Sequence, residues 1–244
     1  MSKRVDRTGE EKINNFGSKM YIIEYKNNKD ITVYFPEYNC YVYNKKYKDW
    51  ISGKIKCPYE RRAYSKGYIG EGEYDSIKNK DAYDKWYDML VRCYSDKYIA
   101  YENAYVCDEW LNFQNFAKWY YDNYYEIQGE QMELDKDILN KGNKVYSPDN
   151  CIFAPKTINL IFIKKKINGT RGLTKDKSRN KYKVQINKHG RHINLGRYET
   201  IEEAFKVYKE VKEKYIKEVA EEYKNKIPNK LYKAMMEYEV EITD

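Results

Sequence analysis

The stretch of residues 134–159 limits what this chain can fold into more than any other part of the sequence. It opens with two carboxylates, Asp135 and Asp137, on either side of Lys136, and continues through a Lys-Gly-Asn segment at 141–143. Asn159 lies near its end, where an apolar run begins. Gly and Asn favour turns between regular elements. Two strands, a loop and a helix fit this order.

The spacing from Asp135 to Asn150 and on to Asn159 resembles the motif of the HNH nucleases. In that family a ββα unit holds one divalent metal ion. The resemblance implies that Asp135 and Asn159 are metal ligands and that Asn150 ties the loop. Lys136 stands at the position of the general base, which is normally His. The unperturbed pKa of Lys is near 10.4, so Lys136 would need strong desolvation to accept a proton.

The surroundings of this stretch resemble a subgroup of HNH-like proteins that is common in bacteriophage genomes. Three segments carry the resemblance, and the last of them reads Tyr-Ser-Pro-x-Asn-Cys. The matching residues are Trp86, Met89, Leu90, Arg92, Cys93, Tyr94, Val106, Cys107, Trp110, Phe113, Phe116 and 146–151. The resemblance implies a phage endonuclease of the homing type, or a descendant that has lost cleavage.

The predicted metal site draws on hard oxygen donors. Asp135 and Asn159 are the expected ligands, with Asp137 as a third, and Mg²⁺ or another divalent cation is the expected metal. Lys136 and Asn150 are the candidate catalytic residues. A structural interpretation stays open, in which Asp135 caps a turn, Lys136 neutralises the acids, and the Asn side chains satisfy loop backbone groups.

Charge is distributed unevenly along the chain. Residues 161–200 contain 12 Lys and Arg but only 2 Asp and Glu, whereas residues 81–160 contain 8 basic and 14 acidic residues. Basic clusters neutralise phosphates and release condensed counterions from nucleic acid. We therefore expect residues 161–200 to contact a polyanion, and a solvated basic face is the alternative.

The last third of the chain is predicted to form a sheet packed on a helix. Apolar Tyr182, Val184 and Ile186 alternate with polar neighbours, as in a strand with one buried face. Thr200 and Glu203 form a capping box that begins a helix. This order resembles the APETALA (ethylene-response-factor) DNA-binding domain, which also occurs attached to phage endonucleases. The matching segments are 171–172, 182–186, 195–198 and 200–204.

The APETALA resemblance implies that a three-stranded sheet enters the major groove of double-stranded DNA and that Arg side chains read guanine edges. The candidate DNA-binding residues are Arg171, Arg179, Lys181, Lys183, Arg191 and Arg197. No Trp follows Trp119, so the Trp contacts of plant members are absent. RNA binding stays open, because a basic sheet also suits RNA.

Two regions precede the HNH-like stretch. Residues 20–35 are predicted to form a β-hairpin, and segments at 40–43, 53–59 and 67–74 extend it into a small β domain. From Asp81 the apolar period becomes helical, and a second helix is predicted from about Glu109. These two helices are expected to support the ββα unit. The predicted fold class is α+β, with a β-rich domain at 1–78, an HNH-like domain at 79–166 and an APETALA-type domain at 167–244.

Composition excludes several classes of protein. Five Cys without a Cys-x-x-Cys pair argue against a disulfide framework and a thiolate zinc site. No apolar run reaches the length of a signal peptide or membrane span. We expect a protein of the host bacterial cytoplasm with no membrane contact. Two hypotheses stay open: a metal-dependent DNA endonuclease, and a catalytically inactive regulator or anti-defence protein that binds DNA or a host protein.

Overall fold

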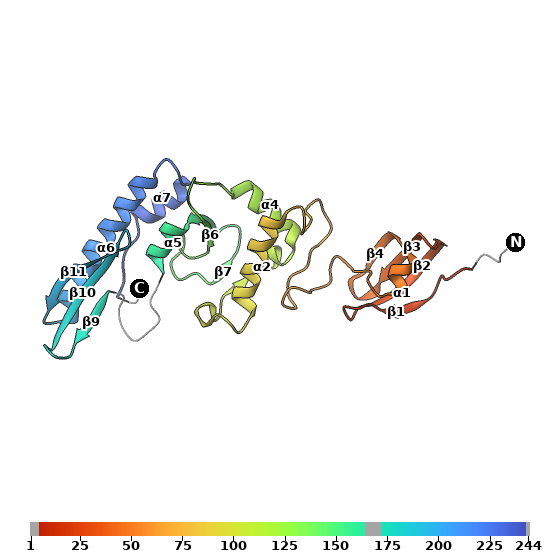
Figure 1. The fold of residues 1–244 in the computed structure, drawn as a ribbon, viewed down its shortest axis with the longest axis horizontal. Coiled ribbons are helices and arrows are strands. Elements are labelled where there is room, and N and C mark those ends of the chain that lie inside the picture. Colours follow the sequence, from red (N-terminus) through yellow and green to blue (C-terminus); the bar gives the residue numbers. More distant parts are fainter. Residues whose placement is uncertain (1–4, 164–171, 243–244) are drawn as a thin grey trace. The chain divides into compact units, whose positions relative to one another are not determined.

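The computed structural model describes residues 5–163 and 172–242 and has the predicted α+β fold class (Figure 1). The chain divides into two compact units, Met1–Asp122 (unit 1) and Asn123–Asp244 (unit 2). The predicted domain boundaries near residues 78 and 166 both fall inside a unit. Within the described part of the chain, no helix is long and apolar enough to cross a membrane.

Unit 1 begins with an antiparallel sheet of strand order β1-β2-β3-β4. The strands are β1 (Glu11–Ile13), β2 (Lys19–Asn27), β3 (Asp30–Phe35) and β4 (Cys40–Lys45), and short helices η1 (Pro36–Tyr38) and α1 (Tyr47–Ile51) complete this part. Pairing of β2 with β3 confirms the predicted hairpin. One face is buried because alternate residues are apolar: Met20, Ile22, Ile31, Val33, Phe35 and Val42 pack with Trp50.

The strands predicted at 53–59 and 67–74 are wrong. Both segments are irregular, apart from isolated bridges that join Ala63 to Gly67 and Tyr68 to Asn112. Gly70 and Tyr68 lie in this loop, and the carbonyl of Tyr68 accepts the N–H of Phe113 at 2.9 Å. Ile55 and Cys57 nevertheless pack into the core of the N-terminal sheet, whereas Tyr68 is joined to the backbone of Phe113.

The helical part of unit 1 comprises α2 (Lys80–Tyr94), η2 (Ile99–Tyr101), β5 (Tyr105–Val106), α3 (Asp108–Leu111) and α4 (Phe113–Asn123). The predicted helix from about Glu109 is two helices, because Asn112 is extended. Its side-chain oxygen accepts the N–H of Gln114 at 3.0 Å, which caps the start of α4. The core here is aromatic, with Trp86, Trp110, Phe113 and Phe116 fully buried.

Unit 2 starts with the predicted ββα order. Strand β6 (Met132–Asp135) pairs antiparallel with β8 (Ile152–Pro155), with Leu134 opposite Phe153. Between them lie an irregular loop of residues 136–144, termed the Asp135 loop, and the short β7 (Val145–Tyr146). Helix α5 (Lys156–Phe162) follows β8 directly. This arrangement places Asp135 at the end of one strand and Asn159 on the helix that follows the other.

The rest of unit 2 is the predicted three-stranded sheet packed on a helix. Its strands are β9 (Leu173–Asp176), β10 (Lys181–Lys188) and β11 (Arg191–Tyr198), in the order β11-β10-β9. Helices α6 (Ile201–Tyr223) and α7 (Asn229–Met236) follow. The Thr200 side chain accepts the N–H of Glu203, and the Glu203 side chain accepts the N–H of Thr200, which confirms the capping box.

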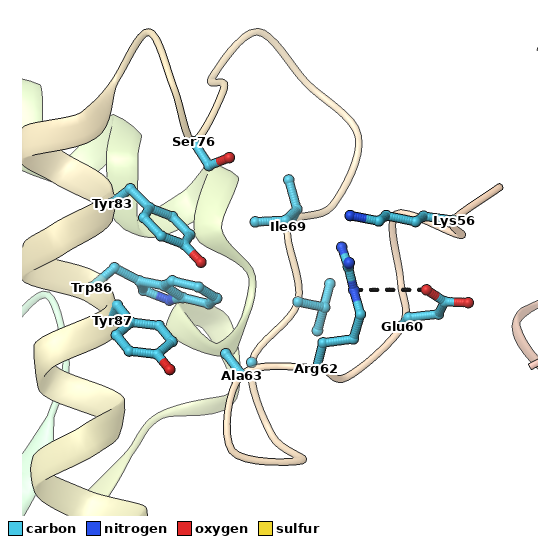
Figure 2. Close-up of a pocket in the computed structure, with 11 residues that line it drawn as sticks. Lys56, Glu60, Arg62, Ala63, Ile69, Ser76, Tyr83, Trp86 and Tyr87 are labelled. Atoms are coloured by element: carbon cyan, nitrogen blue, oxygen red, sulfur yellow. Dashed lines mark ion pairs between the residues drawn. The ribbon is translucent and has the colours of Figure 1, made fainter. Parts of the chain in front are cut away.

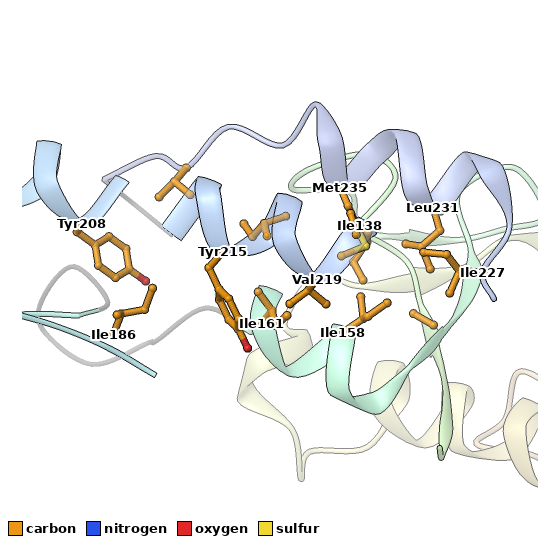
Figure 3. Close-up of a cluster of buried hydrophobic side chains, with 14 of the residues drawn as sticks. Ile138, Ile158, Ile161, Ile186, Tyr208, Tyr215, Val219, Ile227, Leu231 and Met235 are labelled. Carbon is orange, nitrogen blue, oxygen red and sulfur yellow. The ribbon is translucent and has the colours of Figure 1, made fainter. Parts of the chain in front are cut away.

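A single hydrophobic core joins the ββα unit to this sheet (Figure 3). Helix α6 carries both halves of it: Tyr208 lies beside Ile186 of the sheet, and Val219 lies among residues of α5 and α7. The Nζ of Lys212, also buried, donates to the carbonyl of Ile161 at 2.8 Å. The helices from Asp81 and from about Glu109, which were expected to support the ββα unit, belong to unit 1. Within unit 2, α6 and α7 pack against the ββα unit.

Candidate nucleic-acid interface

Asp135 is the last residue of β6, and its side chain closes the turn that follows. Its Oδ1 accepts the backbone N–H groups of Asp137 at 2.8 Å and Ile138 at 2.7 Å. Burial, and then the charge of Asp137, raise the pKa of Asp135 from the usual 3.8 to about 6. The two backbone donors favour the ionised carboxylate but do not outweigh its desolvation. Asp135 thus serves as a turn cap.

Lys136 is only 8% exposed, so its ammonium group needs partners. Nζ donates to Oδ2 of Asp137 at 3.1 Å and to the carbonyl of Asn143 at 3.0 Å. The Asn143 side chain in turn donates to the carbonyl of Lys136 at 2.7 Å. An ammonium that donates to a carboxylate and a carbonyl has no lone pair for accepting a proton. This environment suits a structural cation better than a general base.

The two candidate Asn residues lie in different surroundings. Asn150 connects parts of the loop, because its Oδ1 accepts from Nδ2 of Asn140 at 2.8 Å and its Nδ2 donates to the hydroxyl of Ser147 at 2.9 Å. Asn159 lies in α5 and is half-buried. Asn150 thus fixes the geometry of the loop through these two hydrogen bonds.

The donors of the predicted metal site fit a divalent ion poorly. One oxygen of Asp135 is engaged by two backbone N–H groups, and Asp137 is paired with the Lys136 ammonium. A cation beside these acids competes with a metal for the same oxygens. Within residues 5–163 and 172–242, no group of three or more His, Cys, Asp and Glu side chains could hold a metal ion. Mg²⁺ stays a prediction, and no catalytic step follows from it.

One face of the C-terminal sheet is covered by α6, and the other, termed the open face, is polar. Val184 and Ile186 are buried towards α6, so Lys181, Lys183 and Gln185 alternate onto the open face. Arg197 of β11 lies directly opposite Lys183, and Thr174 of β9 lies on its other side. The open face is therefore defined by Thr174, Asp176, Lys181, Lys183, Gln185, Asn194 and Arg197.

Two of the candidate cations on the open face form ion pairs. Lys181 pairs with Glu199 at 2.6 Å, and Arg197 pairs with Asp176 at 3.3 Å. No Asp or Glu pairs with Lys183 in the part of the chain that the structure describes. Exposed ion pairs contribute only about 0–1 kcal/mol, so a phosphate can replace either acid.

The remaining candidates lie elsewhere. Arg179 is exposed in the turn between β9 and β10, and Arg191 begins β11 opposite Lys188, whose Nζ pairs with Glu218 of α6 at 3.1 Å. Register therefore places Arg191 on the α6 side of the hairpin and not on the open face. Arg171 lies outside the described residues. The structure thus brings Lys181, Lys183 and Arg197 together on the open face, and it places Arg179 in the turn between β9 and β10 and Arg191 on the α6 side.

The predicted DNA-binding residues are all Arg and Lys, and two amides on the open face were not among them. Gln185 lies directly opposite Asn194, across a bulge in the pairing of β10 with β11. Amide side chains can donate to and accept from adenine at once, which makes them base readers in a major groove. The alternation of residues 182–186 could have identified Gln185, whereas the bulge that positions Asn194 is visible only in the structure.

Comparison with models of protein families, with curated proteins and with solved structures finds no match for this chain.

Proposed function

We propose that unit 2 binds double-stranded DNA through the open face of its C-terminal sheet, with the Asp135 loop acting as a scaffold. The observation that carries this proposal is the placement of Lys183 directly opposite Arg197. Arg197 is paired with Asp176, whereas no Asp or Glu pairs with Lys183 in the described part of the chain, so this cross-strand site carries uncompensated positive charge. A phosphate or a guanine edge between the two cations would compensate that charge.

The dimensions of the sheet suit a major groove. Neighbouring strands lie about 4.8 Å apart, so three strands span roughly 10 Å between the outer backbones. The major groove of B-form DNA is about 12 Å wide. Lys183 lies on the central strand β10, where it would lie deepest, and Gln185 lies two residues further along the same face.

The environment of Lys136 favours a binding protein over a nuclease. Cleavage would require Lys136 to lose its proton while it donates to Asp137 and Asn143. The competing proposal, a single-metal endonuclease of the phage homing type, depends on the order of β6, β8 and α5 and on their resemblance to the HNH motif. A plasmid-cleavage assay separates the two.

Fluorescence anisotropy with duplex DNA at several salt concentrations tests the proposal. Wild type should bind with a strong salt dependence, and Lys183→Gln should weaken binding several-fold and reduce the salt slope by about 1, because one phosphate contact is lost. Lys206→Gln is the matched control, since Lys206 is exposed on α6, which covers the other face of the sheet.

Equal binding by wild type and Lys183→Gln would contradict the assignment of the open face. Absence of any binding to duplex DNA would favour a host-protein partner instead. Supercoiled plasmid with Mg²⁺ or Mn²⁺ should stay intact. Metal-dependent nicking that disappears in Asp135→Ala would overturn the scaffold role of the loop.

A further inference from the structure

A pocket of about 230 Å³ lies in unit 1, between α2 and the irregular segment that follows α1 (Figure 2). Its lining combines aromatic rings on one side with charged side chains on the other. Pockets for drug-sized ligands enclose roughly 300–1,000 Å³. This pocket lies below that range and therefore suits a small ligand.

The charged side of the pocket contains two cations that share one aromatic support. Lys56 Nζ lies 4.9 Å from the centre of the Phe16 ring, and the Arg62 guanidinium carbon lies 5.1 Å from it. Cations over a ring face are held there by the ring quadrupole. Both positive charges are thus held beside the Phe16 ring.

Glu60 lies beside Arg62 but leaves the N–H donors of Arg62 largely unused. The Glu60 carboxylate is 2% exposed; one oxygen accepts from Asn14, and the other lies 3.7 Å from Nε of Arg62 without a hydrogen bond. With Lys56 and Arg62 facing one buried carboxylate, the local charge is positive. An anion at this side of the pocket would supply the missing charge and accept the remaining N–H groups of Arg62.

The aromatic side is rigid. The indole N–H of Trp86 donates to the carbonyl of Trp110 at 2.7 Å, and the Tyr83 and Tyr87 rings, 6.0 Å apart, flank it from α2 (Figure 2). A Cβ on Gly67 would lie 2.7 Å from the Trp86 ring, so only Gly lets the loop approach so closely. Tyr83 is half-buried and points from α2 towards the loop that carries Ala63 and Arg62.

We infer that this pocket binds a single nucleotide, with the base against Tyr83 and Tyr87 and the phosphate at Lys56 and Arg62. Stacking on aromatic side chains accepts any base, because every base has a π-face. The adjoining Lys and Arg match the charge of a 5′-phosphate. The inference concerns unit 1 alone and does not depend on duplex binding by unit 2.

Isothermal titration calorimetry of the full chain tests nucleotide binding, with dAMP and dTMP as ligands. Thymidine, which lacks the phosphate, and inorganic phosphate, which lacks the base, are the comparison ligands. Both nucleotides should bind, and thymidine and phosphate should each bind at least about tenfold more weakly, because each lacks one of the two interactions. Arg62→Gln should weaken nucleotide binding by about tenfold. Arg61→Gln, a neighbouring charge that does not line the pocket, should leave it unchanged.

Tyr87→Ala provides a second variant in case Arg62→Gln disturbs the buried Glu60. Tyr87 is 38% exposed, so its loss leaves the core of α2 in place while removing part of the stacking surface. Tyr87→Ala should weaken the binding of dAMP more than the binding of inorganic phosphate. Equal affinities for phosphate and dAMP, equal losses in Arg61→Gln and Arg62→Gln, or no detectable nucleotide binding would each overturn the inference.

Discussion

Replacing Asp135 by Asn should stabilise unit 2 at neutral and alkaline pH. The carboxyl has a pKa raised from 3.8 to about 6 by burial and by the charge of Asp137, so the folded state binds its proton more tightly than the unfolded state does. Stability from this group is therefore present in full below about pH 4 and is lost as pH rises to about 6. Above about pH 6, the ionised carboxylate lowers the free energy of unfolding by a constant amount.

The size of this cost follows from the two pKa values. At about 1.36 kcal/mol per pKa unit, a rise from 3.8 to about 6 corresponds to at most about 3 kcal/mol. An Asn oxygen can accept the same two N–H groups from Asp137 and Ile138, so the turn is retained. Loss of attraction to Lys136 offsets part of the gain. We expect Asp135→Asn to be more stable by about 1–3 kcal/mol near pH 8 and similar to wild type near pH 4.

Urea denaturation, monitored by the hydrogen exchange of peptides from α6, measures the free energy of unfolding of unit 2. All four Trp residues lie in unit 1, so Trp fluorescence of the same samples serves as an internal reference that the substitution should not change. A variant less stable than wild type near pH 8 would refute the reasoning, because Lys136 and the backbone donors would then outweigh desolvation and depress the pKa of Asp135.

The remaining predictions concern the same unit. Lys136→Met keeps the buried stem but leaves the Asn143 carbonyl without its donor, and should cost about 1–3 kcal/mol in urea denaturation. Ile158→Ala, at a fully buried position in the shared core, should cost about 2–5 kcal/mol and raise hydrogen exchange in the sheet and the ββα unit together; exchange raised in the ββα unit alone would argue for separate folding. Thr200→Ala should lower the thermal midpoint by an amount equivalent to about 0.5–2 kcal/mol through loss of the cap. Excess magnesium chloride should leave the stability of unit 2 unchanged, whereas a rise that depends on Mg²⁺ concentration would reveal a metal site.

Local patterns in the sequence predicted the elements whose signals lie within a few residues. The alternation of Tyr182, Val184 and Ile186 identified β10, and the pair Thr200 and Glu203 identified the start of α6. Such signals succeed because strand alternation and helix capping act between near neighbours. They failed at Asn112, where a loop more than forty residues earlier holds the chain extended through Tyr68 and splits one expected helix into two.

The site shows the same division. Residue types and order were enough to select Asp135, Lys136 and the basic strands, but the partners of these side chains were not predictable. Lys183 and Lys181 are equivalent in the sequence pattern, yet only Lys181 has Glu199 beside it. The register of β10 with β11 determines which acid lies beside each Lys. That register includes a bulge that no local sequence pattern predicts.

By itself the sequence determined the α+β class, the ββα order and the concentration of positive charge in residues 161–200, because each of these depends on composition or on short-range periodicity. Only the tertiary structure decided that α6 serves both the sheet and the ββα unit, that Lys136 fills the space between Asp137 and Asn143, and that Trp86 faces Arg62 across a pocket. These features join residues far apart in the chain, and packing of whole elements, which no short segment encodes, places them together.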